Sequence, residues 1–414
     1  MSDAASRAQP NASGASNEKL RIFLIAGEHS GDALGAKLIA ALRQRVGDRL
    51  TLAGVGGDEM EAEGFVSDFP MSDVAVMGPL SILRHLPRIL KSVYGTVDRA
   101  IRFEPDAVVI IDSPEFTHPI AKRIRKRRPD IPIVDYVSPS VWAWRPGRAR
   151  KMRHYVDHVL GLLPFEPAAH ERLGGPPCTY VGHALIERLD WLSNLDTEPL
   201  RARLGLDPAR PIIVALPGSR SSEVGRLMEP FGDTLRLLCE RGPAPQVLLP
   251  CVPHVRALIE QKRKGWPVTA HLLEDPDDKF RAFKLAHAAL AASGTVTLEL
   301  ALAGTPMVVA YRVDPVAAPF LRRMIKAPTT VLANLVLGEN VFPEFHQEKS
   351  SPENLAAALM PLLSDTPERR AQLAGLARIP GLIRIEGGKE PSGIAAEIVL
   401  SYARAGKERR AGPM

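Results

Sequence analysis

The stretch LRIFLIAGEHSGD, residues 20–32, decides the class of fold. Residues 20–26 are almost all apolar, as in a strand buried on both faces of a parallel sheet. A polar turn follows, and a helical pattern then runs from about Ala33 to Arg45. This strand–turn–helix order predicts the first half of a βαβ unit.

The same alternation continues along the chain in two series. We expect strands at 50–55, 106–111, 131–137 and 156–163, then at 211–216, 246–249, 268–273, 288–292 and 307–311. The sequence therefore predicts an α/β fold with two doubly wound, Rossmann-like domains facing a cleft, with ligands beyond the carboxyl ends of the strands. The expected organisation is a disordered tail at 1–17, an N-terminal domain at 18–190, a C-terminal domain at 191–365, and a helical segment at 366–414 that returns to the N-terminal domain.

The composition excludes several classes of protein. With 414 residues, 45% of them hydrophobic and 24% charged, the chain is neither fibrous nor largely disordered. The net charge of +6 permits an anionic ligand or membrane surface and does not require nucleic acid. Three scattered cysteines argue against disulfides and structural zinc and fit a cytoplasmic protein. No stretch approaches the roughly 18 apolar residues of a transmembrane helix, so we expect any membrane contact to be peripheral.

Two polar sites follow strands of the first series. The turn Gly27–Asp32 lacks the G-x-G-x-x-G spacing of dinucleotide-binding loops, and its Glu28 or Ser30 is placed to hydrogen-bond a polar substrate. Alternatively, Ser30 or Asp32 only caps the following helix. Asp112 directly follows a buried strand, where a carboxylate is well placed as a general base, although it also suits the cap of the next helix.

Two loops of the second series have the residues of a phosphate site. In Gly218-Ser219-Arg220, small residues let backbone N–H groups approach an anion at a helix N-terminus, and the arginine adds a forked guanidinium. Ser293-Gly294-Thr295 has the same kind of small and hydroxyl residues after a strand. Glu299 follows about one helical turn later, so a diphosphate bound at this helix N-terminus would put its ribose near the Glu299 carboxylate. Together, the two loops and Glu299 predict a binding site for a nucleotide diphosphate. The alternative for the first loop is a Pro-Gly turn with a surface arginine.

Patterns that could bind a metal are weak. Asp275 and Asp277 have the D-x-D spacing of some metal-dependent enzymes, but they lie in a proline turn before a helix, so capping is the better interpretation. His154 and His158 lack the glutamate of H-E-x-x-H and a third ligand. We therefore expect neither a metal site nor a resident cofactor.

Residues 77–97 contain an amphipathic helical pattern, which Pro87 is expected to kink or split. Apolar residues recur at helical spacing between basic ones, which suits a helix lying at a membrane surface. The alternative is a helix packed on its own sheet. The apolar positions are Met77, Leu80, Leu83, Leu86 and Leu90, and the basic positions include Arg84 and Arg88.

Eight motifs, taken in order, resemble the lipid-A-disaccharide synthase family. The most specific is SPSVWAW at 138–144. The others are AGEHSGD (26–32), VMG (76–78), IDSP (111–114), LPFE (163–166), VGH (181–183), LPGSR (216–220) and SGT (293–295) with Glu299.

The resemblance implies an inverting, metal-independent glycosyltransferase of the B type. Such an enzyme joins UDP-2,3-diacylglucosamine to 2,3-diacylglucosamine 1-phosphate, giving the β-1,6-linked lipid A disaccharide 1-phosphate and UDP. It works at the cytoplasmic face of the inner membrane, which implies a Gram-negative bacterium and an anionic membrane surface as partner.

The resemblance also implies roles for particular residues. Asp112 would be the base on the acceptor 6-hydroxyl, with Glu28 and Ser30 lining the same cleft. The segment 77–90 would meet membrane and acyl chains. The UDP-sugar donor would be held by Gly218, Ser219, Arg220, the turn 293–295, Glu299, Asn334 and Gln347.

Two other functions remain open at this point. A UDP-sugar 2-epimerase uses the same two-domain scaffold and nucleotide site, but it has no need for the apolar, basic segment after Met77. In a peripheral, non-enzymatic nucleotide-sugar-binding membrane protein, Asp112 would be merely structural.

Overall fold

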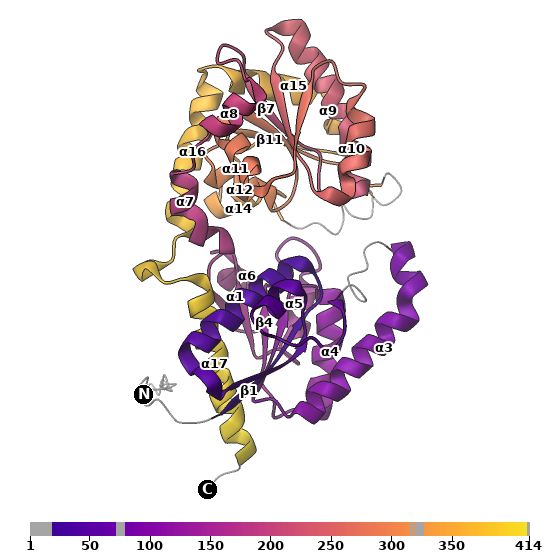
Figure 1. The fold of residues 1–414 in the computed structure, drawn as a ribbon, viewed down its shortest axis with the longest axis vertical. Coiled ribbons are helices and arrows are strands. Elements are labelled where there is room, and N and C mark those ends of the chain that lie inside the picture. The colour runs from indigo at the N-terminus through magenta and orange to yellow at the C-terminus, as the bar shows by residue number, and fades with distance from the viewer. Residues whose placement is uncertain (1–18, 72–78, 315–317, 319–326, 412–414) are drawn as a thin grey trace, which may run out of the picture. The chain divides into compact units, whose positions relative to one another are not determined.

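The computed structural model describes residues 19–71, 79–314, 318 and 327–411, without the side chains of 79–86 and 386. Contacts divide the chain into two compact units. One unit combines residues up to 134 with those from 396 onward, and the other contains residues 135–395. Figure 1 shows helices covering the faces of two sheets, which confirms the expected α/β class.

The first sheet has six strands in the order β2-β1-β3-β4-β5-β6, and β1 pairs in parallel with both of its neighbours. Its central strands are apolar and buried, as the hydrophobic runs predict. The strands are β1 (Leu20–Ala26), β2 (Leu50–Val55), β3 (Ala107–Ile111), β4 (Ile133–Tyr136), β5 (His158–Gly161) and β6 (Cys178–Tyr180). The helices between them are α1 (His29–Val46), α2 (Asp58–Ala62), α3 (Pro79–Phe103), α4 (Pro114–Arg127), α5 (Gly147–Met152) and α6 (Glu166–Leu173), and α7 (Leu189–Ser193) follows β6.

The second sheet has the order β12-β11-β10-β7-β8-β9, again with parallel pairs. One apolar core lies on each of its faces. Its strands are β7 (Ile212–Leu216), β8 (Gln246–Pro250), β9 (Ala270–Leu273), β10 (Ala288–Ala292), β11 (Met307–Tyr311) and β12 (Glu344–His346). Its helices are α8 (Glu198–Leu204), α9 (Ser221–Arg241), α10 (Arg256–Arg263), α11 (Pro276–Leu285), α12 (Val296–Leu302), α14 (Leu332–Leu337), α15 (Pro352–Leu359) and α16 (Pro367–Ile383).

Pro87 does not split helix α3, which continues on both sides of it, so of the two expected effects the split does not occur. Pro87 is exposed, so water can hydrogen-bond the carbonyl that loses its partner one turn earlier. Beyond Pro87, Val93, Val97 and Ala100 are buried and anchor the helix. The carboxyl half of α3 therefore packs on the protein itself.

The last helix, α17 (Pro391–Ala411), contributes its residues from 396 onward to the first unit. Lys407 Nζ donates to the carbonyl of Lys19 at 3.0 Å, and the Arg410 guanidinium contacts the Asp106 carboxylate. Asp106 also accepts the backbone N–H of Arg21 at 2.7 Å. The C-terminal helix thus lies beside the amino end of β1 (Figure 1), whereas α16 packs into the core of the second unit.

Candidate functional site

The backbone at the carboxyl end of β3 is strained. Asp112 and Ser113 have φ angles of 54° and 45°, a left-handed conformation that is uncommon for residues other than glycine. Two such residues in succession persist only where the surrounding structure imposes them, and they cluster at functional sites. The strain turns the chain sharply between the buried strand and α4.

The Asp112 carboxylate is held by hydrogen bonds from two serines. Ser30 Oγ donates to Asp112 Oδ2 at 2.5 Å, and the backbone N–H of Ser113 donates to Oδ1 at 2.8 Å. β1 and β3 pair with Ala26 opposite Ile111, so the start of α1 lies beside the end of β3. Gly31 permits this approach, because a Cβ there would lie 3.0 Å from the carbonyl oxygen of Ile111.

Glu28 joins the same cluster, whereas Asp32 does not. Ser113 Oγ donates to Glu28 Oε1 at 3.4 Å, and Glu28 is half-buried. The buried Asp32 instead accepts three backbone N–H groups at the start of α2, including that of Gly57 at 2.7 Å, so it caps a different helix from the one expected. The N-cap of α4 is Ser113, and no side chain caps that helix.

The loop after β7 folds around the Glu223 carboxylate, which was not among the site residues predicted from the sequence. Glu223 Oε2 accepts the backbone N–H groups of Ser219 at 3.2 Å and Arg220 at 3.3 Å, and Oε1 accepts from Arg220 Nη1 at 3.0 Å. Gly218 has φ 116°, and a Cβ there would lie 2.5 Å from the Glu223 side chain. The R-S-S-E spacing of a capping box was the available signal.

The loop after β10 carries the second predicted phosphate element. Ser293 Oγ donates to the carbonyl of Thr330 at 2.9 Å, Gly294 is open on its Cβ side, and Thr295 is the N-cap of α12. Glu299 on α12 accepts two hydrogen bonds from Lys279 Nζ on α11, each 3.0 Å long. Lys279 is a further charged residue at this position that sequence reasoning missed.

Asn334 is buried, and its side-chain amide makes three hydrogen bonds with the backbone and a longer one, 3.4 Å, to Thr329 Oγ1. Its Oδ1 accepts the N–H groups of Val341 at 3.0 Å and Phe342 at 2.9 Å, and its Nδ2 donates to the carbonyl of Phe342 at 2.9 Å. The side chain therefore fixes the turn after α14. Any effect on a donor would pass through that turn and not through direct contact.

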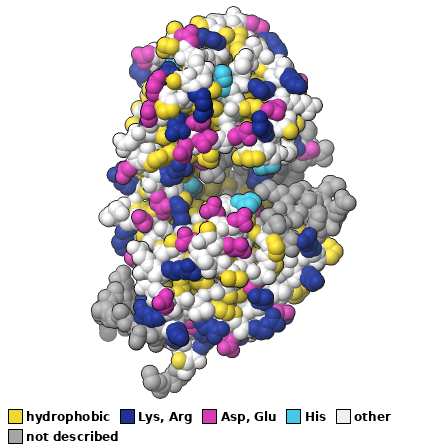
Figure 2. Space-filling model, viewed as in Figure 1, with side chains coloured by type: hydrophobic (Ala, Val, Ile, Leu, Met, Phe, Trp, Pro, Cys, Tyr) yellow, Lys and Arg dark blue, Asp and Glu magenta, His cyan; other side chains and the backbone are white. Residues whose placement is uncertain are grey.

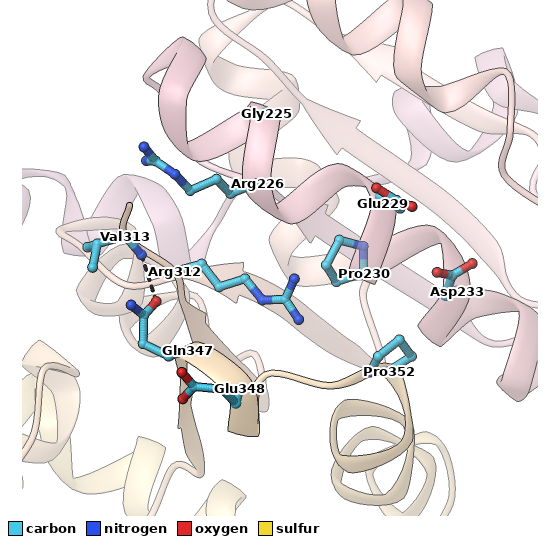
Figure 3. A pocket seen from close by; sticks show the side chains of 10 residues that line it. All are labelled: Gly225, Arg226, Glu229, Pro230, Asp233, Arg312, Val313, Gln347, Glu348 and Pro352. Atoms are coloured by element: carbon cyan, nitrogen blue, oxygen red, sulfur yellow. Dashed lines mark hydrogen bonds between the residues drawn. The ribbon is translucent and has the colours of Figure 1, made fainter. Parts of the chain in front are cut away.

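Gln347 lies at the rim of a pocket of about 580 Å³ (Figure 3). Its Oε1 accepts the backbone N–H of Val313 at 2.8 Å, and its own φ is 53°. The Arg312 guanidinium enters the middle of the pocket and donates to the carbonyl of Ser350 at 2.7 Å. Glu344 lies three residues before Gln347, on β12; burial alone would raise its pKa, but hydrogen bonds from His346 and Thr330 lower that pKa to about 2.

The SPSVWAW segment is anchored on a buried carboxyl. Glu166 accepts hydrogen bonds from Trp142 Nε1 at 3.2 Å and from the backbone N–H of Leu163 at 3.0 Å. Burial raises the pKa of Glu166 to about 7 in spite of these hydrogen bonds. Val137, the residue directly before the segment, has φ 87°, which is a rare conformation for a β-branched residue.

The expected membrane segment is only partly described. Met77 lies outside the described residues, as do the side chains of Leu80, Leu83, Arg84 and Leu86. Arg88 is exposed, and Leu90 has 42% of its surface exposed. Acidic and basic side chains are interspersed on the face shown in Figure 2. Among the described residues, no helix is both long and apolar enough to cross a membrane.

The two metal-like patterns have structural partners. Asp275 caps α11 by accepting the backbone N–H groups of Asp277 and Asp278, each at 2.9 Å. Asp277 pairs with Arg188 at 3.0 Å, and His158 hydrogen-bonds Thr179 at 2.9 Å. Within the described part of the chain, no group of three or more His, Cys, Asp or Glu side chains could hold a metal ion.

Solved structures share this fold. UDP-GlcNAc 2-epimerase from Neisseria meningitidis, bound to UDP-GlcNAc, matches with a TM-score of 0.63 and 15% identity, covering 92% of this chain and 100% of that chain. The calicheamicin glycosyltransferase CalG4 matches with a TM-score of 0.54 and 15% identity, covering 95% and 100%. The fold is therefore the two-domain α/β class found in UDP-sugar epimerases and glycosyltransferases.

Sequence comparison narrows the class to one family. The model of the lipid-A-disaccharide synthetase family matches residues 22–397. The lipid-A-disaccharide synthase of Bradyrhizobium diazoefficiens is 50% identical over 389 residues, which are 94% of this chain and 98% of the relative. That of Paramagnetospirillum magneticum is 41% identical over 393 residues, covering 94% and 100%. The chain belongs to the lipid-A-disaccharide synthetase family.

Proposed function

We propose that this chain is an inverting glycosyltransferase that joins UDP-2,3-diacylglucosamine to 2,3-diacylglucosamine 1-phosphate. The products are the β-1,6-linked lipid A disaccharide 1-phosphate and UDP. The observation that carries the proposal is the Asp112 carboxylate, held by Ser30 on strained backbone at a strand end, in a chain that belongs to this family.

Asp112 acts as the general base in this proposal. Each of its oxygens accepts one hydrogen bond from a serine, and a carboxylate oxygen can accept a second, so the acceptor 6-hydroxyl can bind there. The proton of that hydroxyl passes to Asp112 while its oxygen attacks the anomeric carbon of the donor. The bond from that carbon to the UDP oxygen breaks, and the configuration inverts. Glu28 and Ser30 position the base.

The donor half of the reaction belongs to the second unit. Arg220 balances the charge that develops on departing UDP, and Glu223 holds its guanidinium in place. The turn 293–295 contributes backbone N–H groups to the phosphates, and Glu299 bonds the ribose. Gln347 contacts the sugar through its Nε2 amide, while Asn334 shapes the neighbouring turn.

The proposed location is the cytoplasmic face of the inner membrane. Both substrates carry acyl chains, which the protein must reach from water. The exposed Leu90 and Arg88 on α3 fit an apolar helix face with a basic edge at the headgroup layer.

One assay separates the candidate functions. The protein is supplied with both acylated sugars, and UDP release is measured together with disaccharide formation. We expect both products in equal amounts, and only when the acceptor is present. Epimerisation of a UDP-sugar without acceptor would support the epimerase, and binding without turnover would support the non-enzymatic alternative.

A further inference from the structure

A second charged pocket lies at the opposite end of β1 from Asp112. It has a volume of about 330 Å³ and is formed by the first unit alone. Arg21 lies in β1, five residues before Ala26. Ala26 pairs with Ile111 of β3, the residue directly before Asp112. About 17 Å of strand therefore separates Arg21 in the pocket from the proposed base. Its lining residues include Arg21, Phe23, Asp68, Arg99, Arg102 and Phe103.

Three guanidinium groups and one carboxylate line this pocket, so its charge is positive. The Arg21 guanidinium lies over the Phe103 ring, 4.6 Å from the centroid, and its buried Nε has no hydrogen-bond partner. Arg102 is exposed and makes no hydrogen bond or ion pair with any described residue. Two of the three cations therefore retain donors for a ligand.

Asp68 leaves an acceptor unused in the same pocket. Its side chain is only 3% exposed, and Arg99 contacts its Oδ1. Its Oδ2 is buried without a hydrogen-bond partner. Burial raises the pKa of Asp68 although Arg99 and Arg102 oppose this. An unsatisfied buried carboxylate oxygen is uncommon in proteins, and a donor on a ligand would satisfy it.

We propose that this pocket binds a phosphate monoester that carries a hydroxyl or ammonium group close to the phosphate. Arg21 and Arg102 hold the phosphate oxygens, for which the guanidinium fork is well suited, and the neighbouring group donates to Asp68 Oδ2. The rings of Phe23 and Phe103 form the apolar wall. The volume is near the lower limit of ligand sites, so it suits a headgroup-sized molecule.

The phosphate cannot belong to an acceptor whose hydroxyl is at Asp112. A hexose ring is much shorter than the 17 Å or so between the two places. The ligand is therefore a second molecule, either a free sugar or glycerol phosphate or the headgroup of a membrane lipid. The chemistry recognised is the same in both cases.

Calorimetric titration of the full-length protein with glycerol 3-phosphate tests this site. We expect saturable binding to one site, at least about tenfold weaker binding in Arg102→Ala, and unchanged binding in Arg404→Ala, since Arg404 is an exposed arginine on α17 outside the pocket. Saturating UDP should leave the affinity unchanged. Absent binding, equal weakening in the two variants, or competition by UDP would overturn the proposal.

Asp68→Asn tests the recognition of the donor group. The measured quantity is the ratio of affinities for glycerol 3-phosphate and methyl phosphate, which is independent of any general loss of folded protein. We expect the preference for glycerol 3-phosphate to fall several-fold in this variant. An unchanged ratio would remove Asp68 from the site and contradict the ligand class.

Vesicle sedimentation distinguishes the two sources of phosphate. Phosphatidylcholine vesicles with and without lysophosphatidic acid, a phosphate monoester that keeps one free glycerol hydroxyl, are compared for the wild type, Arg102→Ala and Arg404→Ala. Retention on vesicles with lysophosphatidic acid that is lost only in Arg102→Ala, and that glycerol 3-phosphate displaces, identifies a lipid headgroup. Binding of the free ester with vesicle retention equal in all three proteins identifies a soluble ligand.

Discussion

Ser30 Oγ lies 2.5 Å from Asp112 Oδ2, although 82 residues separate them in the chain. The contact exists because the parallel pairing of β1 and β3 brings the turns after both strands to one edge of the sheet. A hydroxyl donor at this distance fixes the direction of the carboxylate while leaving lone pairs for a substrate.

Replacing Asp112 by Asn should lower kcat by about 10²- to 10⁴-fold, because the amide cannot accept the acceptor proton. UDP affinity and the melting temperature should change little. Ser30→Ala removes only the positioning hydrogen bond and should have a smaller effect. Steady-state kinetics with UDP binding by calorimetry measure both. Near-normal kcat in Asp112→Asn would show that another group is the base, and Glu28 would be tested next.

Replacing Arg220 by Ala should weaken UDP binding at least about tenfold and also slow turnover, because its charge acts on both bound and departing UDP. Arg236→Ala is the matched control, since Arg236 is an exposed arginine on α9, the helix that Arg220 precedes, and it pairs with Asp233. Equal UDP affinities in the two variants would contradict a role for Arg220 in the donor site.

Activity should persist in excess EDTA. Asp275, Asp277 and Asp278 are engaged in a helix cap and in ion pairs, so the D-x-D pattern is not available to a metal. The measurement is UDP release with and without EDTA. If turnover is lost and is then restored by Mg²⁺ or Mn²⁺, the metal-independent assignment is wrong.

Leu90→Ser should reduce sedimentation with anionic vesicles and activity on long-chain substrates, while the melting temperature stays nearly constant. Leu90 is 42% exposed, so little buried surface is lost. Val93→Ser on the same helix is the contrast: Val93 is 3% exposed, and the change should cost about 2–4 kcal/mol of stability. A large loss of stability in Leu90→Ser would favour the alternative in which this helix face is packed.

The free energy of unfolding should depend on pH through the titration of Glu166. Burial raises the pKa of its carboxyl from 4.5 to about 7 in the folded protein, so the folded state holds the proton more tightly than the unfolded chain. Protonated Glu166 therefore contributes to the free energy of unfolding. This contribution is fully present below about pH 4.5 and is lost as the pH rises through 7 and the buried carboxyl must ionise. Relative to Glu166→Gln, the free energy of unfolding should fall by about 3 kcal/mol between pH 5 and pH 8. Urea unfolding at both pH values measures this, and a constant difference would contradict it.

The sequence allowed prediction of strands with long apolar runs. The bounds of β1, β2, β10 and β11 match the expected residues. β6 and β12 were missed because each has three residues, all only partly buried, and such short strands have no hydrophobic run. Helix α1 starts at His29 and not near Ala33, because the polar turn itself is helical.

The candidate site was predictable only where a residue directly follows a strand. Asp112 and Arg220 were found in this way. Glu223 was missed because its contact depends on how the preceding loop folds back on α9. Lys279 was missed because it lies on a different helix from Glu299, 20 residues earlier in the chain. No helical or strand periodicity in the sequence relates the two positions. Asn334 matched a family position, but only the structure shows that its amide is occupied by the backbone.

The position of α17 has a consequence for biosynthesis. Arg410 meets Asp106 across 304 residues of chain, and Lys407 meets Lys19 across 388. A ribosome releases residues 19–134 long before it has made the helix that completes their fold. The amino end of β1 therefore stays uncovered while the second unit is translated. Removing residues 396–414 would damage the part of the enzyme that is made first.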